Sequence, residues 1–233
     1  MRRSMRAAIA AMTLAWAAAG CSSAVQGAAA APAPAPEWHA LLGTGSMDQW
    51  RGYRDEADTA WHVANGVLTK SGPASDIITR MPYRNFELDF DWKISTGGNS
   101  GVFYRATEEY DHVYWSGPEF QLLDDANAPD GQSRLTAAGS DYAVYPSPAG
   151  FVKPADQWNT ARIVVNGNHV EHWLNGHEMV SYDLRSPDWT ARVAGSKFAA
   201  WPDYGLAPAG YIGIQGDHPG TLSLRNMRIR ELP

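Results

Sequence analysis

The sequence predicts an all-β domain built as a two-sheet sandwich or jelly roll. No stretch has the apolar spacing of a long helix, and short alternating runs are separated by Gly, Asn, Asp and Pro at spacings of roughly ten residues. Two Asn-Gly pairs stand between such runs, which is a strong signal for two-residue hairpin turns. Residues 37–233 are long enough for one domain with a sizeable core.

The stretch from Phe86 to Trp92 is the most regular predicted strand. Aromatic residues and leucine fall on one face, and carboxylates fall on the other. Asp89 and Asp91 imitate the paired carboxylates of laminarinase-like sandwiches, which need an acid and a nucleophile close together. The alternation of apolar and acidic residues already explains the two aspartates without a catalytic role, so we expect them on a solvated strand face.

The two Asn-Gly pairs divide residues 162–183 into a predicted three-strand meander. If both pairs occupy the centres of two-residue turns, His172 faces Met179 and Arg162 faces Glu171. The same register puts His172 on the core face, where a hydrogen-bonded core histidine is expected. A metal cluster of the neighbouring histidines is disfavoured, because alternation separates their side chains.

The first twenty residues predict an export leader. A basic start is followed by a short apolar run rich in alanine and a small-residue cleavage site. The segment from Ala18 to Cys21 resembles the bacterial lipobox, which implies that Cys21 becomes the lipidated first residue of the mature protein. Ser22 in the next position favours the outer membrane by the same resemblance. The alternative is an ordinary cleaved signal with an incidental cysteine.

Residues 21–36 continue as an Ala- and Pro-rich tether that cannot bury a core. Removing the leader's Arg2, Arg3 and Arg6 changes the formal charge from −6 to −9, since −6 − 3 = −9. An acidic chain without a basic cluster is not expected to bind nucleic acid. The only cysteine is Cys21, so the domain has no disulfide, and membrane contact is expected through the lipid anchor alone.

Three segments carry polar residues that a sandwich does not require. Glu119 and Gln121 alternate with apolar neighbours, so both project from one sheet face about 7 Å apart. Arg105 ends a strand that follows a glycine-rich turn. Gln215 stands at a predicted strand end, and His218 lies in the loop after it. The segments are 97–105, 117–125 and 210–218.

These segments resemble the 3-keto-disaccharide hydrolase family over residues 38–232. The resemblance implies a concanavalin-like jelly roll, exported from bacteria, that acts on glycosides oxidised at sugar C3. It rests on the motifs Asn-Ser-Gly-Val-Phe-Tyr-Arg (99–105), Glu-Phe-Gln-Leu-Leu-Asp (119–124), Trp-Asn (158–159), His-Trp-Leu-Asn-Gly (172–176), Gly-Ile-Gln (213–215) and Leu-Arg-Asn-Met-Arg-Ile (224–229).

The chemistry that the resemblance implies needs a base, a stabilised enolate and an acid. A C3 ketone acidifies the C2 proton, so a base removes it and the enolate expels the C1 substituent. We predict Glu119 as the base, Arg105 as enolate stabiliser or substrate-orienting group, and His218 as a further catalytic group. The predicted substrate-binding residues are Asn99, Gln121, Asp124, Lys197 and Gln215.

Two departures from the family pattern leave alternatives open. Ala128 stands where the family often has a histidine before Pro-Asp, and Gly216 interrupts the motif around Gln215 and His218. The sequence identifies no cofactor and leaves a divalent metal open as an alternative. The alternatives to an enzyme are a carbohydrate-binding, lectin-like lipoprotein and, more weakly, an adhesion or scaffold lipoprotein. Asn99 is either a ligand contact or a turn former.

We predict that Cys21→Ser abolishes membrane attachment. The variant should appear as soluble protein or uncleaved precursor, because the anchor is the diacyl group on that sulfur. Fractionation followed by detection of the mature chain measures this. Unchanged membrane association with normal cleavage would reject the lipoprotein hypothesis.

Overall fold

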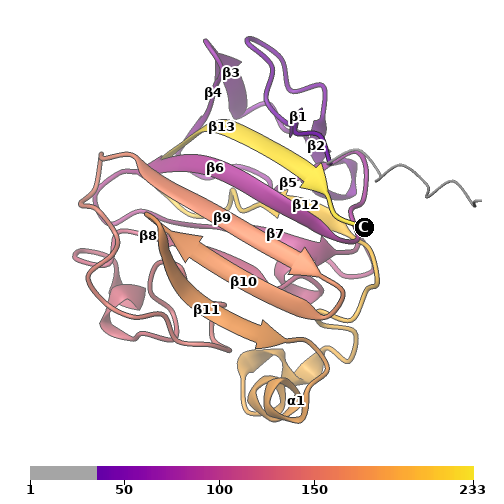
Figure 1. Ribbon diagram of the computed structural model, residues 1–233. Coiled ribbons are helices and arrows are strands. Elements are labelled where there is room, and N and C mark those ends of the chain that lie inside the picture. The colour runs from indigo at the N-terminus through magenta and orange to yellow at the C-terminus, as the bar shows by residue number, and fades with distance from the viewer. Residues whose placement is uncertain (1–35) are drawn as a thin grey trace, which may run out of the picture. The chain divides into compact units, whose positions relative to one another are not determined.

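The computed structural model describes residues 36–233. The predicted leader, Cys21 and most of the tether lie outside these residues. The described chain folds into two antiparallel sheets packed face to face, and Figure 1 shows the larger sheet in front of the smaller one. The predicted two-sheet jelly roll is therefore confirmed.

The larger sheet has eight strands in the order β11-β10-β9-β6-β13-β4-β3, and β1 pairs with β13. Its strands are β1 (His39–Ala40), β3 (Trp61–Ala64), β4 (Val67–Ser71), β6 (Phe86–Ile94), β9 (Asn159–Asn166), β10 (His169–Leu174), β11 (His177–Asp183) and β13 (Thr221–Glu231).

The smaller sheet has five strands in the order β2-β5-β12-β7-β8. Its strands are β2 (Trp50–Gly52), β5 (Ile77–Thr79), β7 (Asn99–Ala106), β8 (Glu119–Leu123) and β12 (Tyr211–Ile214). The described chain has a single α-helix, α1 (Pro187–Ala194), beyond β11 (Figure 1). The described residues also form four short 3₁₀ helices, at Tyr53–Asp55, Val113–Trp115, Pro129–Gln132 and Lys197–Ala200.

The core lies between the two sheets. Strand β6 alternates buried and half-buried residues along its whole length, as its sequence predicts. Phe90 of β6 meets Phe120 of β8 edge to face, with ring centroids 5.9 Å apart. Phe120 therefore points into the sandwich, and its neighbours along β8 point to the outer face of the smaller sheet. That alternation positions the candidate site.

The second hairpin turn forms where the sequence predicts it, but the strands that it joins contain a bulge. Asn175 and Gly176 both have positive φ, 50° and 83°. The register then shifts after Trp173, so His172 lies opposite Val180 and not opposite the predicted Met179. One extra residue in β11 takes up the difference.

The first turn is displaced from its predicted position. His169 pairs with Asn166, so Gly167 and Asn168 are the central residues of this turn. A glycine with φ of 61° at the first central position suits a type II′ turn. Arg162 consequently lies opposite Trp173, and the predicted pairing with Glu171 is wrong.

His172 is a fully buried core histidine, as expected. Its Nδ1 lies 3.3 Å from the carbonyl of Gly139, and its Nε2 lies 2.9 Å from the hydroxyl of Tyr104. Burial lowers the pKa of His172 to about 3, so the ring is neutral at physiological pH.

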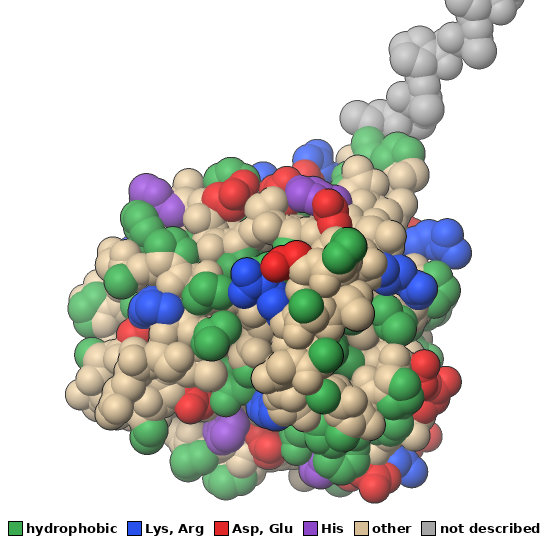
Figure 2. Space-filling model, turned by 90° about the horizontal axis from the view of Figure 1, so that it is seen from below, with side chains coloured by type: hydrophobic (Ala, Val, Ile, Leu, Met, Phe, Trp, Pro, Cys, Tyr) green, Lys and Arg blue, Asp and Glu red, His purple; other side chains and the backbone are tan. Residues whose placement is uncertain are grey.

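Surface charge is mixed in sign. Seen from below, acidic and basic side chains are scattered among polar and apolar ones (Figure 2). Within residues 36–233, none of the helices is long and apolar enough to cross a membrane.

Candidate active site

The candidate site lies on the outer face of the smaller sheet. Glu119 and Gln121 project there from β8, because Phe120 and Leu122 point into the core. Both polar residues are buried, with exposed fractions of 4% and 0%. Glu119 and Gln121 thus share one sheet face, as predicted, and both side chains are largely shielded from water.

A row of residues crosses the sheet at this level. Gln121 pairs with Gly101 of β7. The backbone N–H of Gln215, just after β12, donates to the Gly101 carbonyl at 3.0 Å. Ile214 pairs with Ile77, so Asp76 comes next to Gln215 in the same row. Residues far apart in the sequence are therefore neighbours.

The absence of a side chain at Gly101 makes room for the Glu119 carboxyl group. A Cβ atom placed on Gly101 would lie only 1.9 Å from Glu119 Oε1. The carboxyl group thus lies over the glycine and extends from β8 toward Gln215. It makes no hydrogen bond with any other residue in 36–233 that meets normal geometry.

Burial raises the pKa of Glu119 to about 8. The positive charge of Lys197 works in the opposite direction, and the nearby carboxylates of Asp76 and Asp217 add to the rise. A carboxyl group in this state has a proton affinity far above that of an exposed glutamate. Such a group suits acid–base chemistry near neutral pH.

Lys197 supplies the positive charge of the site. Its Nζ lies 4.2 Å from the centre of the Tyr142 ring and 5.1 Å from that of Phe198. None of the carboxylates in residues 36–233 lies within 4.0 Å of this Nζ. Desolvation lowers the pKa of Lys197, although Glu119 and other carboxylates oppose the change. Its ammonium group is therefore free to meet a ligand.

Two glutamines flank the Glu119 carboxyl group and offer unused acceptors. Gln121 donates to Asn99 Oδ1 at 3.3 Å and to the Thr136 carbonyl at 3.2 Å. The Oε1 atoms of Gln121 and Gln215 are buried and lack hydrogen-bond partners among the described residues. Buried acceptors without partners are costly, so a ligand hydroxyl would stabilise them.

Asn99 belongs to a second polar group at the same end of the sheet. Its Nδ2 donates to Asp130 Oδ2 at 3.0 Å, and the Tyr142 hydroxyl donates to the same oxygen at 3.3 Å. Because Lys197 lies over Tyr142, this group joins the lysine to Gln121. The structure thus brings together Glu119, Gln121, Asn99, Lys197 and Gln215 of the predicted site residues.

Arg105 does not join them. Its guanidinium donates to the backbone carbonyls of Gly167 and Ala207, the latter at 3.1 Å. The residue is 3% exposed and has a positive φ of 53°, which turns its side chain away from the course of β7. These contacts tie two loops together, and the geometry gives no support to the predicted catalytic role of Arg105.

Asp124 is also structural. One carboxylate oxygen accepts from the backbone N–H of Gly97 at 2.8 Å and from Asn127 at 2.7 Å. The other oxygen accepts from the Ala126 N–H at 3.3 Å. Both oxygens are engaged in shaping loops, so the predicted substrate contact is not supported. Ala128 packs against the core at the start of the next 3₁₀ helix.

His218 lies at the rim of the site. Its side chain is 39% exposed, and its Nε2 is 3.8 Å from Asp217 Oδ1. Its position follows from Lys70, a buried residue of β4, whose Nζ donates to the carbonyls of Gly216 and His218. Burial lowers the pKa of Lys70, opposed by Asp217 and Asp76.

Sequence reasoning missed both Asp76 and Lys70. Asp76 precedes a three-residue strand, and its neighbour Gln215 comes from the far end of the chain. Lys70 looks like an ordinary strand lysine in the sequence. Only the register of the sheets reveals either residue. In the described part of the chain, no three His, Cys, Asp or Glu side chains are arranged to hold a metal ion.

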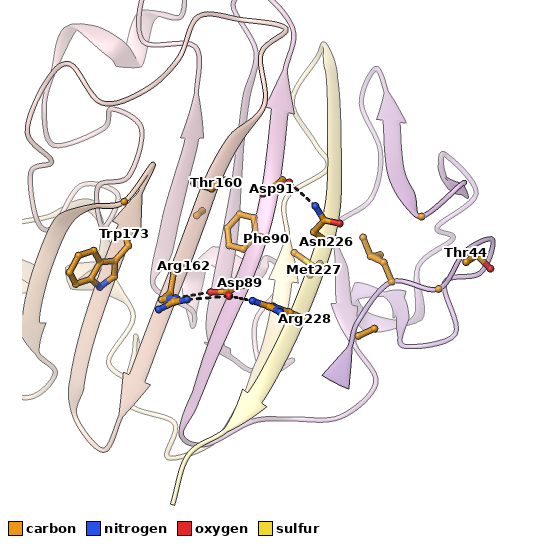
Figure 3. A pocket seen from close by; sticks show the side chains of 16 residues that line it. Thr44, Asp89, Phe90, Asp91, Thr160, Arg162, Trp173, Asn226, Met227 and Arg228 are labelled. Carbon is orange, nitrogen blue, oxygen red and sulfur yellow. Dashed lines mark hydrogen bonds and ion pairs between the residues drawn. The ribbon is translucent and has the colours of Figure 1, made fainter. Parts of the chain in front are cut away.

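A separate groove of about 920 Å³ crosses the outer face of the larger sheet (Figure 3). Asp89 there binds Arg162 at 2.7 Å and Arg228 at 2.9 Å, and Asp91 binds Asn226 at 2.8 Å. The carboxylates are thus engaged by neighbouring side chains and form the solvated strand face that the sequence predicts. The isolated, buried carboxyl groups lie on the other sheet.

Residues 37–230 match the family model of the 3-keto-alpha-glucoside-1,2-lyase-like domain. The chain belongs to this family. A curated 3-keto-disaccharide hydrolase of Bacteroides thetaiotaomicron is 32% identical over 220 residues, covering 80% of this chain and 76% of that protein. The family and this relative make the chain an enzyme of glycoside cleavage.

Solved structures agree with the family membership. The crystal structure of a candidate glycosyl hydrolase from Parabacteroides distasonis is 32% identical, with a TM-score of 0.78, and the match covers 84% of this chain and 94% of that one. A Thermotoga petrophila laminarinase domain is 10% identical, with a TM-score of 0.50, and covers 84% and 99%. The latter likeness shows the fold alone.

We predict that Gly101→Ala lowers the pKa of Glu119. The added methyl group would occupy the place of the carboxyl group, which sits at the end of a flexible side chain and would move toward solvent. Carbon-13 NMR titration of labelled glutamate carboxyl groups measures the change, with Glu119→Gln assigning the signal. Gly45→Ala is the control, because nothing lies within 4 Å of a Cβ there. An unchanged midpoint near 8 in Gly101→Ala would contradict this geometry.

Proposed function

We propose that the protein cleaves the glycosidic bond of 3-keto-glycosides, 3-keto-disaccharides among them, by removing the proton from sugar C2. The observation that carries this proposal is the Glu119 carboxyl group, which is buried, lacks a hydrogen-bond partner among the described residues and lies within electrostatic reach of the Lys197 ammonium group. The name of the Bacteroides relative supports the same substrate class.

Glu119 has the properties that a base for a carbon acid needs. A C3 ketone makes the C2 proton acidic, because the electron pair left at C2 spreads onto the ketone oxygen as an enolate. In its ionised form Glu119 has no competing hydrogen bond to give up before it takes this proton. Its position over Gly101 places the carboxyl group on the outer face of the smaller sheet, which is the face that we propose the sugar meets.

Lys197 is the natural partner of the enolate. An ammonium group without a carboxylate within 4.0 Å in residues 36–233 is available to the negative oxygen that forms as C2 loses its proton. The free Oε1 acceptors of Gln121 and Gln215 would hold sugar hydroxyls at the same time. Together they orient C2 toward Glu119 and O3 toward Lys197.

The lectin-like alternative requires a site that binds sugar without reactive groups. A buried carboxyl group with a raised pKa, within electrostatic reach of a cation, favours catalysis over binding alone. Export and attachment through a lipid at Cys21 complete the proposal for this protein, and they are supported by the sequence of residues 1–36.

We expect Glu119→Gln to abolish turnover of a 3-keto-glucoside. Glutamine keeps the size of the side chain but cannot take the C2 proton, so kcat/KM should fall by about 10² to 10⁴ or more. The thermal midpoint should stay near that of the wild type, because the lost carboxyl group has no hydrogen-bond partner.

Glu178→Gln is the matched control, because Glu178 is exposed on β11 and lies outside the site. The unoxidised glucoside should be inert toward the wild type, since its C2 proton is far less acidic. Cleavage of that glucoside at a comparable rate would refute the mechanism. Binding of both sugars without cleavage of either would favour the lectin-like alternative.

Activity should rise with pH up to about 8. Burial stabilises the protonated form of Glu119, so the fraction of ionised base grows as pH increases through a pKa of about 8. The charged groups that act on this ionisation are Lys197, Asp76, Asp217 and Asp141. The dependence of kcat/KM on pH for a ketone with a good leaving group measures it. A flat profile from pH 6 to pH 8 would exclude Glu119 as the base.

A further inference from the structure

Asp76 is the second buried carboxyl group on the outer face of the smaller sheet. It immediately precedes β5 and is 9% exposed. Its Oδ1 accepts the backbone N–H of Gly216 at 2.7 Å. Its Oδ2 has no hydrogen bond to another described residue, so one oxygen fixes the group and the other is available.

The surroundings of Asp76 hold a proton on it near neutral pH. Burial raises its pKa to about 7, and the negative charges of Asp217 and Glu56 add to the rise. The Gly216 N–H and the Lys70 ammonium group act in the opposite direction without cancelling it. At neutral pH the group is thus able both to donate and to accept a proton.

Asp76 and Glu119 lie on opposite sides of Gln215. The Glu119 carboxyl group lies over Gly101, and the row continues through Gln215 to Asp76. Two strand spacings, about 10 Å in all, therefore separate the Glu119 carboxyl group from the Asp76 backbone. The negative charge of Asp76 raises the pKa of Glu119, and the charges of both carboxylates raise the pKa of Tyr114, so the two groups lie within electrostatic reach of each other and of that tyrosine.

We propose that Asp76 is the catalytic acid that protonates the departing glycosidic oxygen, and the base that afterwards activates water. This assignment rests on the proposed function, and it makes the enzyme a hydrolase rather than a lyase. Other groups fit less well. His218 and Asp217 are 39% and 48% exposed, and burial raises the pKa of Tyr114, which makes it a weaker acid.

The elimination step balances with these two carboxyl groups. Glu119 takes the C2 proton, and the C2–H electron pair forms the enolate. The enolate then restores the C3 carbonyl and forms a C1–C2 double bond, while the C1–O bond breaks. Its electron pair goes to the glycosidic oxygen, which takes the proton of Asp76. Glu119 is now protonated and Asp76 is ionised.

The hydration step reverses both changes. Water adds to C1 of the unsaturated ketone and gives a proton to the Asp76 carboxylate. The electron pair of the C1–C2 bond moves to form the enolate again, and protonated Glu119 returns its proton to C2. One water is consumed, the glycosidic bond is hydrolysed, and both carboxyl groups return to their first state. The cycle needs no oxidant or reductant.

The test compares leaving groups in Asp76→Asn. Methyl 3-keto-α-glucoside needs a proton on its leaving oxygen, whereas 4-nitrophenyl 3-keto-α-glucoside releases a stable anion. We expect kcat/KM to fall by about 10² to 10⁴ for the methyl substrate and by less than about tenfold for nitrophenol release. Exchange of the C2 proton of the methyl substrate with deuterated water, followed by NMR, should persist because Glu119 performs it.

Hydration provides a second measurement. With the nitrophenyl substrate, Asp76→Asn should accumulate the unsaturated ketone, which absorbs in the ultraviolet, because water is no longer activated. The wild type should pass through it without accumulation. Asparagine keeps an acceptor for the Gly216 N–H, so the thermal midpoint should remain near that of the wild type.

Asp217→Asn is the matched charge control, since Asp217 also acts on Glu119 but is half exposed. This variant should change kcat/KM for the methyl and the nitrophenyl substrate by the same factor. An equal loss on both substrates in Asp76→Asn, with loss of C2 exchange, would make Asp76 structural and overturn the proposal, as would unchanged rates on both. If the wild type leaves both ketones intact, the proposed function fails instead.

Discussion

The site depends on the burial of a carboxyl group against the bare backbone of Gly101. A folded protein normally solvates or pairs such a group, because an unpaired charge in a poorly solvated place is costly. Here the cost appears as a proton that Glu119 keeps to unusually high pH. The packing of two sheets on one another stabilises the domain enough to carry this local cost. The packing of the sandwich thus allows Glu119 to remain buried on the outer face, where its raised pKa suits acid–base chemistry.

The regular parts of the fold could be predicted because their signals are local. Alternation with a period of two places Glu119 and Gln121 on one face and His172 in the core. The Asn175-Gly176 turn forms because both residues tolerate positive φ. The first turn differs from its predicted position because Asn166-Gly167-Asn168 contains a Gly-Asn pair as well as an Asn-Gly pair, and the chain uses the former as its type II′ turn. The bulge in β11 leaves no mark in the sequence.

The differences between the predicted and the observed site have the same origin. Arg105 belongs to a polar strand end, but a positive φ and a register shift between β12 and β7 direct its guanidinium to backbone carbonyls. Asp76 was missed because it joins the site only through the pairing of β5 with β12, which places it next to Gln215. Gln215 was marked by its polar character at a predicted strand end, and Lys197 entered only after the family resemblance had been drawn. The role of a side chain that depends on the pairing of distant strands cannot be predicted from the local sequence pattern.

Lys70 has a consequence for how the site moves. The residue belongs to β4 of the larger sheet, pairs with Leu222, and holds the carbonyls of Gly216 and His218 in the loop after β12 of the smaller sheet. The loop that carries Asp217 is therefore tied to the opposite layer of the sandwich. Opening this loop on its own would leave the buried ammonium group with the Gly72 carbonyl, 3.3 Å away, as its one remaining acceptor among the described residues, so local unfolding there is costly. The amide of Gly216 should exchange with solvent about as slowly as the core strands, and substrate should meet a preformed surface rather than a closing lid.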